Sequence, residues 1–262
     1  MPSSYHVGLS LPENASTYVV RSADEELLTE LQNGKFCCVL GARQTGKSSL
    51  LVKTIHDLRA INYECVHLYF RSENNSNEDN WYWNIANQLR NNLSCLSDLN
   101  IEDWWNEHNS LSPFKKIEIF FQELVLEQRQ SRNYLIAILI DEVDSIQELN
   151  FSIEKFWKLI EFYTSQQNSK ICFAIFGVLK PDSLKTDHLK NFCQIFLTNF
   201  QQGNLIPLQS GLSGKGDRRK ILAEIFKWTG GQPLLTQKIC QIVQDLWLFV
   251  TLYAKSTDKM PR

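Results

Sequence analysis

Several features that would assign a chain to a particular class are missing from this sequence. Its 262 residues include seven cysteines, an odd number, without a C-x-x-C pair, and five histidines without the spacing of metal ligands. We therefore expect neither a disulfide framework nor a zinc site. The formal net charge is only −2, so the chain as a whole has no electrostatic preference for nucleic acid or for an anionic membrane.

Targeting and membrane-spanning segments are missing as well. Residues 1–20 contain no basic segment followed by an apolar core, so no signal peptide is predicted. The apolar run Leu246–Val250 is far shorter than the roughly 20 residues that span a bilayer. We expect a cytoplasmic protein with no membrane partner. Four cysteines within apolar runs are expected to be reduced core thiols: Cys37, Cys38, Cys172 and Cys240.

One short segment has a direct chemical meaning. Gly41–Ser48 fits G-x-x-x-x-G-K-[ST], the Walker A loop that encloses nucleotide phosphates. Gly41 and Gly46 allow tight backbone turns, so that successive N–H groups point into one concavity. Lys47 would contact the outer phosphates, and the Ser48 hydroxyl would ligate Mg²⁺. The residues expected to contact the nucleotide here are Gly41, Ala42, Arg43, Gln44, Thr45, Gly46, Lys47, Ser48 and Ser49.

The sequence on both sides of this loop supports the interpretation. The apolar run Phe36–Leu40 is typical of a strand that is buried on both faces. After the loop, Leu51, Ile55 and Leu58 recur at helical spacing, so we expect a helix from near Lys47 with its positive dipole end at the phosphates. Strand, loop and helix are the context that a phosphate loop requires. The alternative is a glycine-rich loop that binds nothing.

A second motif supplies the acidic residues that such a site needs. Leu135–Ile140 is a run of six apolar residues, and Asp141 and Glu142 follow it directly, as in a Walker B strand. In P-loop proteins the first acid holds the metal, usually through water, and the second orients or deprotonates the attacking water. We therefore predict that Asp141 is on the metal side, and that Glu142 and Lys47 are catalytic. The alternative is a solvated charge cluster at the end of a strand.

Strand-like and helix-like segments alternate over most of the chain. The predicted strands are 36–40, 64–70, 135–141, 171–178 and 194–198, and the predicted helices are 24–32, 47–60, 81–93, 113–130 and 153–167. This order predicts an α/β fold, a P-loop NTPase with a central parallel sheet flanked by helices. The ligand would lie beyond the carboxyl ends of the strands, where both motifs are found.

The C-terminal part is expected to form a short helical appendage. We predict one domain over residues 1–203 and the appendage over 204–262, which contains a glycine-rich loop and then two helices, Arg218–Trp228 and one from Pro233. The second helix carries an apolar stripe that needs a surface to cover it, either the nucleotide domain or a partner. The stripe consists of Leu235, Ile239, Ile242 and Leu246.

A family resemblance rests on five segments in a fixed order: Tyr18–Asp24, Phe36–Ser49, Ile140–Ser145, Phe173–Val178 and Trp228–Cys240. Together they resemble the AAA-like domain that is common in cyanobacterial proteins, which is similar to the STAND class of signalling ATPases. The resemblance covers residues 18 to about 243. Family members usually continue into a winged-helix-like region and often into repeats, so we expect this chain to be a truncated form or a stand-alone ATPase part.

The resemblance also implies two further contacts with the nucleotide. Arg21 lies in the segment that, in related ATPases, is beside the base; the alternative is a surface arginine near a helix start. Pro233 belongs to the sequence Gly231-Gln232-Pro233, which matches the G-x-P motif whose proline packs near adenine. The local alternative for this motif is a helix stop followed by a proline that starts the next helix.

These observations together predict a function. We expect a P-loop NTPase that binds ATP or ADP with Mg²⁺ and acts as a nucleotide-dependent signalling or assembly switch with slow ATP hydrolysis. Its partner would be another protein or a second copy of the chain. The alternative is a non-catalytic nucleotide-binding or interaction module, left by truncation of a larger STAND-like protein. The net charge and the missing winged helix argue against a third function, a DNA-associated ATPase, so no nucleic-acid partner is expected.

Overall fold

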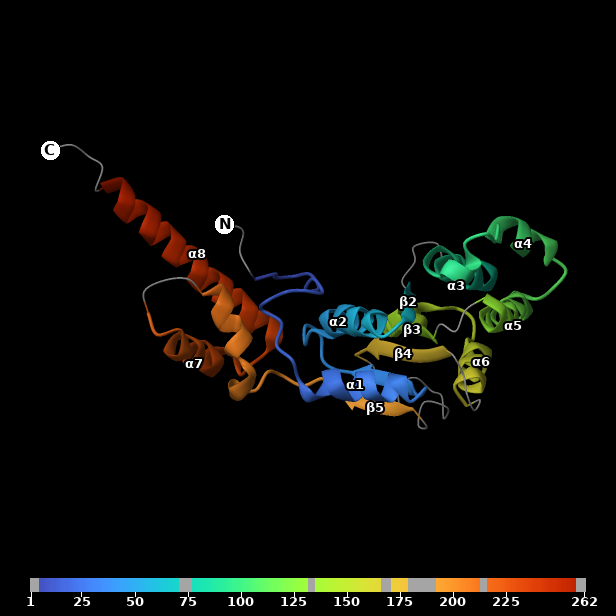
Figure 1. Ribbon diagram of the computed structural model, residues 1–262, viewed down its shortest axis with the longest axis horizontal. Helices are drawn as coiled ribbons and strands as arrows, with labels where there is room; N and C mark the ends of the chain where they lie inside the picture. The colour runs from blue at the N-terminus through green and yellow to red at the C-terminus, as the bar shows by residue number, and fades with distance from the viewer. Residues whose placement is uncertain are drawn as a thin grey trace. The chain divides into compact units, whose positions relative to one another are not determined.

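The protein contains a parallel β-sheet flanked by helices, as the sequence predicts. The computed structural model describes residues 5–70, 77–131, 135–165, 171–178, 192–212 and 216–257 (Figure 1). The strands are β1 (Phe36–Leu40), β2 (Tyr63–Tyr69), β3 (Leu135–Asp141), β4 (Ile171–Gly177) and β5 (Cys193–Phe196). Their order is β2-β3-β4-β1-β5, and every neighbouring pair is parallel.

The sheet is covered on both faces, which explains its apolar strands. Every residue of β1 and β4 is buried, and in β3 only Leu135 is exposed. A strand buried on both faces has no alternation of polar and apolar residues. Because all strands are parallel, β1 and β3 end at the same edge. Leu40 leads there into the glycine-rich loop, and Asp141 is the last residue of β3.

Eight α-helices accompany these strands in the described part of the chain. They are α1 (Ser22–Gln32), α2 (Lys47–Ala60), α3 (Glu78–Asn92), α4 (Ile101–Glu107), α5 (Pro113–Ser131), α6 (Glu154–Ser165), α7 (Arg218–Thr229) and α8 (Pro233–Thr257). The ends differ from the predicted ones by a few residues, as is usual where helices fray. The sequence prediction missed α4, and it also missed the short 3₁₀ turns Gln202–Asn204 and Ile206–Gly211.

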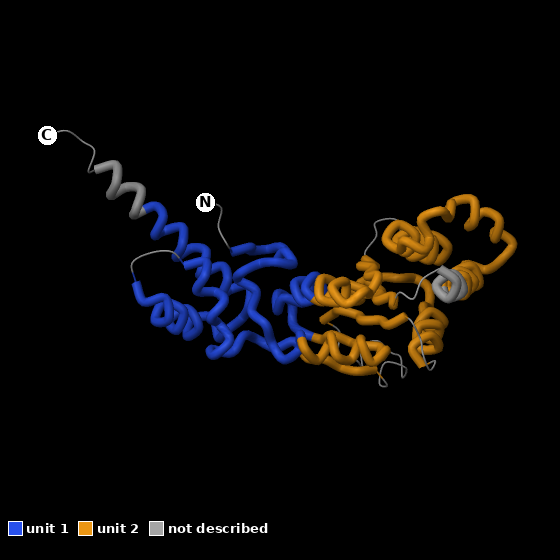
Figure 2. The backbone as a smooth tube through the Cα atoms, in the orientation of Figure 1, with its two compact units in different colours: residues 1–24, 41–53, 197–262 blue, residues 25–40, 54–196 orange. Residues whose placement is uncertain are grey.

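The chain forms two compact units, which are interleaved in the sequence (Figure 2). Unit 1 comprises residues 1–24, 41–53 and 197–262, and unit 2 comprises 25–40 and 54–196. Unit 2 contains the sheet and an aromatic core, and unit 1 contains the glycine-rich loop with α7 and α8. The smaller core of unit 1 consists of Tyr5, Val19, Phe200, Leu205, Leu208, Leu212, Leu222, Ile225 and Cys240. A domain boundary after residue 203 stays a prediction.

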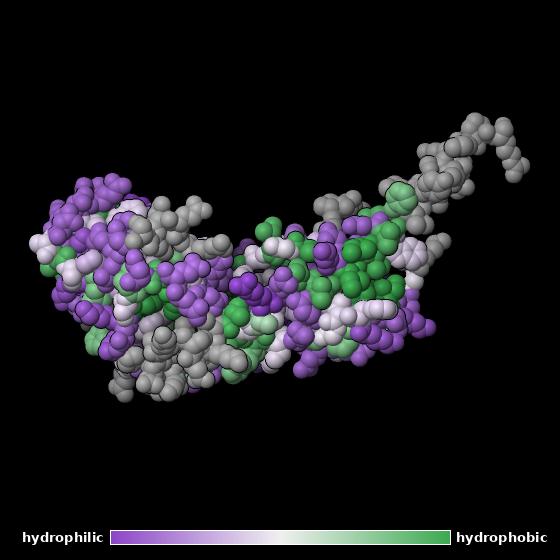
Figure 3. All heavy atoms as spheres, turned by 180° about the vertical axis from the view of Figure 1, so that it is seen from behind, coloured by the Kyte–Doolittle hydropathy of each residue, from purple (hydrophilic) through white to green (hydrophobic). Residues whose placement is uncertain are grey.

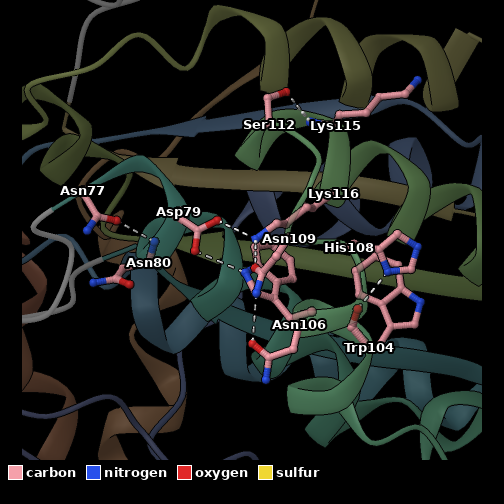
Figure 4. A network of polar contacts seen from close by, with 11 residues as sticks. Asn77, Asp79, Asn80, Trp104, Asn106, His108, Asn109, Ser112, Lys115 and Lys116 are labelled. Atoms are coloured by element: carbon pink, nitrogen blue, oxygen red, sulfur yellow. Dashed lines mark hydrogen bonds and ion pairs between the residues drawn. The ribbon is translucent and has the colours of Figure 1, made fainter.

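An ion pair between a buried lysine and a partly exposed aspartate connects helices of unit 2 (Figure 4). Nζ of Lys116 in α5 lies 2.9 Å from Oδ1 of Asp79 in α3 and donates to Oδ1 of Asn109 at 3.0 Å. The ammonium also lies 4.8 Å from the ring centroid of Trp105 in α4, whose Nε1 donates to Oδ2 of Asp79. The Lys116 side chain is only 4% exposed, so these partners offset the cost of burying its charge.

The apolar stripe of α8 is largely uncovered. Leu235, Ile242 and Leu246 are exposed by 48%, 48% and 60%, and Phe249 extends the stripe with 68% exposed. Figure 3 shows hydrophobic side chains gathered over the part of the molecule that contains α8. Within the described chain these residues are therefore not covered, and the expectation that the nucleotide domain or a partner covers the stripe stays a prediction. Cys240 of α8 belongs to the core of unit 1, and Ile239 of the stripe packs against that core.

Candidate functional site

The phosphate loop of unit 1 has two glycines with a steric role. Gly46 has a φ of 88°, in the left-handed region that side chains disfavour. A Cβ atom on Gly41 would lie 2.8 Å from Oγ1 of Thr45 and 3.0 Å from the carbonyl oxygen of Leu197. Gln44 also has a positive φ, 65°, although it is not a glycine. The loop therefore has a specific strained shape that its surroundings must maintain.

The ammonium of Lys47 is turned back over the loop. Nζ of Lys47 donates to the carbonyl oxygens of Gly41 and Ala42, at 2.9 and 2.8 Å. Oγ1 of Thr45 donates to Ala42 as well, at 2.8 Å. A phosphate oxygen would compete well for this ammonium, because hydrogen bonds between two charged groups are stronger than those to a neutral carbonyl. The ammonium of Lys47 therefore already lies at the loop whose bound phosphates it would contact.

Arg21 holds this loop from outside. Its Nη1 donates to the carbonyl oxygen of Thr45 at 2.7 Å and to that of Thr198 at 3.3 Å, and its guanidinium carbon lies 5.4 Å from the centroid of the Phe200 ring. Arg21 is 8% exposed, so it is not a surface arginine. Its contact with the nucleotide base stays a prediction. A carbonyl held in this way fixes the orientation of its peptide, whose N–H is at Gly46.

The G-x-P turn between α7 and α8 contacts the same loop. Nε2 of Gln232 donates to the carbonyl oxygen of Gln44 at 3.1 Å, while its Oε1 accepts from the N–H of Leu235 at 2.6 Å. One side chain therefore caps α8 and holds the phosphate loop. Gln232 was not singled out from the sequence, although it is a hydrogen-bonding side chain between a glycine turn and a helix-starting proline. Pro233 is buried and is the first residue of α8.

A second connection runs from this turn to the loop through Phe200. The N–H of Phe200 donates to the carbonyl oxygen of Gly231 at 2.8 Å. A Cβ atom on Gly231, whose φ is 73°, would lie only 2.2 Å from the carbonyl oxygen of Phe200. The ring of Phe200 in turn faces the guanidinium of Arg21. Arg21, the phosphate loop and the G-x-P turn, which the sequence connected only by resemblance, thus lie together within unit 1.

The predicted acidic pair lies in unit 2, at the end of β3. Asp141 is 7% exposed, and its Oδ1 accepts the N–H of Glu142 at 2.8 Å. Glu142 has a left-handed φ of 53°, an unusual conformation for a residue other than glycine. Asp144 accepts the N–H of Val178 at 2.9 Å, which fixes the segment after β3 to the end of β4. Backbone N–H groups therefore orient the carboxylates of Asp141 and Asp144.

Two aromatic residues of β2 border this acidic pair. Nε2 of His67 lies 3.9 Å from Oδ2 of Asp141, and the rings of His67 and Tyr69 are in contact, with centroids 3.9 Å apart and planes tilted by 36°. Burial lowers the pKa of His67, and the negative charge of Asp141 acts in the opposite direction. Burial, together with Asp141 and Glu142, raises the pKa of Tyr69. Neither aromatic residue was singled out from the sequence.

Each of the two motifs offers an oxygen donor of the kind that Mg²⁺ prefers. Among the described residues, no group of three or more His, Cys, Asp or Glu side chains could hold a metal ion. Mg²⁺ is usually bound through one or two carboxylates, water and substrate phosphates, and not by a cage made of protein alone. Asp141 and the hydroxyl of Ser48 offer the hard oxygen donors that this ion prefers. The residues thus fit a metal that arrives with phosphate.

Comparison with known proteins agrees with these observations. The family model of the AAA-like domain matches residues 7–256. The chain belongs to this family. It is 38% identical over 252 residues to an uncharacterized WD repeat-containing protein of Synechocystis sp.. The match covers 92% of this AAA-like chain and 21% of that relative, so the chain spans about a fifth of the relative's length.

Two solved structures show the same kind of fold. The ORC1 protein of Aeropyrum pernix, solved in complex with DNA, has a TM-score of 0.56 at 10% identity, and the match covers 89% of this AAA-like domain and 62% of that chain. A Walker-type ATPase of Pyrococcus abyssi has a TM-score of 0.51 at 12% identity, and the match covers 96% of this AAA-like domain and 79% of that chain. The fold is therefore that of P-loop ATPases, which supports nucleotide binding. No helix in the described residues is long and apolar enough to cross a membrane.

Proposed function

We propose that this AAA-like domain binds ATP with Mg²⁺ and acts as a nucleotide-dependent switch with slow hydrolysis. The observation that carries the proposal is the hydrogen bond from Gln232 to the carbonyl oxygen of Gln44. It connects the loop that would hold the phosphates to the turn that starts α8. Any change in the loop on nucleotide binding therefore acts directly on the cap of that helix.

The roles within the site follow from the chemistry of each residue. The loop amides and Lys47 bind the phosphates, with Lys47 leaving the carbonyl oxygens of Gly41 and Ala42. Ser48 and Asp141 would hold Mg²⁺, which would supply positive charge to neutralise the transferred phosphoryl group. Glu142 orients and deprotonates the attacking water. These roles require that the phosphate loop and the acidic pair act on one nucleotide. Strands β1 and β3, which precede the two motifs, end at the same edge of the sheet, and this supports the requirement.

The contacts of Arg21 lead us to expect slow hydrolysis of ATP. Rapid hydrolysis in P-loop NTPases commonly depends on an arginine that stabilises the transition state, and that arginine is often supplied by another molecule. Arg21 is committed to the backbone of the loop and to Phe200. In this proposal Arg21 maintains the conformation of the phosphate loop. A self-associating or partner-bound form would hydrolyse ATP faster than the isolated chain.

The alternative function, an interaction module that does not switch, also has an observation in its favour. The uncovered stripe on α8 would serve such a module without any nucleotide-driven change. DNA binding has weaker support, because the likeness to a DNA-bound protein at 10% identity concerns the fold alone.

Hydrogen exchange with and without nucleotide tests the switch. Mg²⁺ with ATP should slow exchange in Gly41–Ser49 and also in residues 230–237, because ligand binding suppresses local opening. ADP should protect residues 230–237 less than ATP does. Protection confined to Gly41–Ser49 would favour the non-switching module.

A matched variant tests the hydrogen bond itself. Gln232→Glu keeps an oxygen that accepts from Leu235 but removes the N–H that Gln44 accepts. It should therefore leave exchange at the start of α8 unchanged without nucleotide, and it should abolish the ATP-dependent protection of residues 230–237. Lys47→Ala serves as the control in which neither segment is protected. Protection of residues 230–237 that persists in Gln232→Glu would show that the coupling does not pass through Gln232.

A further inference from the structure

We propose that His67 is a positioning residue that holds the carboxylate of Asp141 for the metal. The inference rests on the proposed binding of Mg²⁺ with nucleotide, and it adds a residue from β2 to that site. His67 would donate a hydrogen bond from Nε2 to Oδ2 of Asp141, and it would not itself bind the metal.

The sheet register places the two side chains on one face. His67 is paired with Leu139 across β2 and β3, two residues before Asp141. Side chains two residues apart on a strand point to the same face, so His67 and Asp141 are neighbours there. Their closest polar atoms, Nε2 and Oδ2, are 3.9 Å apart, and the two side chains are 21% and 9% exposed.

The carboxylate of Asp141 is an acceptor within reach of Nε2 of His67. This nitrogen is buried, and within the described residues it has no hydrogen-bond partner. A buried polar atom without a partner costs on the order of 1–3 kcal/mol. The present distance is about 1 Å longer than a normal hydrogen bond. A small rotation of either side chain would close it, and then the neutral ring carries its proton on Nε2.

The two oxygens of Asp141 would then have different partners. Oδ1 accepts the N–H of Glu142 at 2.8 Å. With Oδ2 held by His67, the plane of the carboxylate is fixed from both sides. Hydrogen bonds to the groups that hold a metal typically change metal affinity by 10- to 100-fold. That range sets the size of the expected effect.

Tyr69 and Gln88 keep this part of β2 in place. The ring of Tyr69 packs against that of His67 in a tilted arrangement, which limits the rotation of the imidazole. The backbone of Tyr69 is held at both its N–H and its carbonyl by the side chain of Gln88 in α3, at 2.9 and 3.2 Å. Strand β2 lies at the edge of the sheet, with β3 on one side. The contacts of Tyr69 and Gln88 thus anchor β2 close to His67.

The test compares His67→Leu and His67→Gln with the unchanged protein. The amide nitrogen of glutamine can reach the position of Nε2, whereas leucine offers no donor. The affinity for a fluorescent ADP is measured in EDTA and over a series of free Mg²⁺ concentrations. His67→Leu should raise the half-saturating Mg²⁺ concentration about 10- to 100-fold. Its affinity in EDTA should be unchanged, and His67→Gln should lie within about threefold of the unchanged protein.

Each other outcome overturns a defined part of the account. Equal Mg²⁺ dependence in His67→Leu and the unchanged protein would refute the role of His67 while leaving nucleotide binding intact. A His67→Gln variant as weak as His67→Leu, or an equal loss of affinity in EDTA, would also refute it. If the unchanged protein bound no nucleotide at all, the proposed function itself would fail.

Discussion

Two adjacent glycines offer a test of how the G-x-P turn supports the site. Gly230 and Gly231 both have a left-handed φ, 58° and 73°. A Cβ atom on Gly230 would meet nothing within 4 Å, whereas on Gly231 it would lie 2.2 Å from the carbonyl oxygen of Phe200. Gly230→Ala and Gly231→Ala therefore share the backbone strain and differ in the space available.

The expected magnitudes follow from these distances. Alanine in the left-handed region costs about 1–2 kcal/mol in either variant. At Gly231 the backbone must also shift away from Phe200, and overpacking of this kind typically costs about 1–3 kcal/mol. Loss of the hydrogen bond from Phe200 to Gly231 adds about 1 kcal/mol. Gly231→Ala should thus be the more destabilising variant by about 2–4 kcal/mol.

Native-state hydrogen exchange over residues 218–244 measures the difference, because it reports the free energy of local opening. Gly231→Ala should also weaken ATP binding, since Phe200 carries the ring that faces Arg21. Gly230→Ala should bind ATP like the unchanged protein. Equal opening free energies, or equal ATP affinities, in the two variants would refute the steric connection between the turn and the loop.

Three further predictions concern other parts of the molecule. Glu142→Gln should keep ATP binding and lower turnover by about 10²- to 10⁴-fold in a phosphate-release assay, and turnover at the original rate would make Glu142 a surface acid. Asp79→Asn should lower the free energy of unfolding, measured by urea denaturation, by about 1–3 kcal/mol, because the buried ammonium of Lys116 loses its counter-charge. As a control, Glu118→Gln removes the partner of an exposed ion pair and should lower it by less than about 0.5 kcal/mol. Burial raises the pKa of Cys38 to about 12, so its thiol is protonated at pH 8 and should resist alkylation until the protein unfolds. Rapid labelling of Cys38 in the native protein would contradict its burial.

The parts of the fold that follow from local patterns were predictable from the sequence. The apolar runs Phe36–Leu40 and Leu135–Ile140 have few alternatives to buried parallel strands, and the structure contains both. Helix α4 was missed because it is only seven residues long and its stability depends on two tryptophans that pack against other helices. A helix this short has no periodicity to detect and is marginal by itself.

Contacts between distant segments could not be predicted in the same way. Gln232 and Gln44 are 188 residues apart, and no local pattern indicates that one donates to the other. His67 and Glu64 are polar residues in a largely apolar strand, and for His67 this is compatible with a surface position until the register with β3 is known. The stripe on α8 was correctly placed on one helix face, but the periodicity does not say whether anything covers that face.

Nucleotide binding through Lys47 is the central claim, and equilibrium titration with a fluorescent ATP analogue tests it most directly. The unchanged protein should bind in the presence of Mg²⁺. Lys47→Ala should bind at least about 10- to 100-fold more weakly, because it loses a charge-assisted contact worth about 1.5–3 kcal/mol, while keeping its circular dichroism spectrum. Equal affinity in the two proteins, or no binding by the unchanged protein, would contradict the assignment of the site.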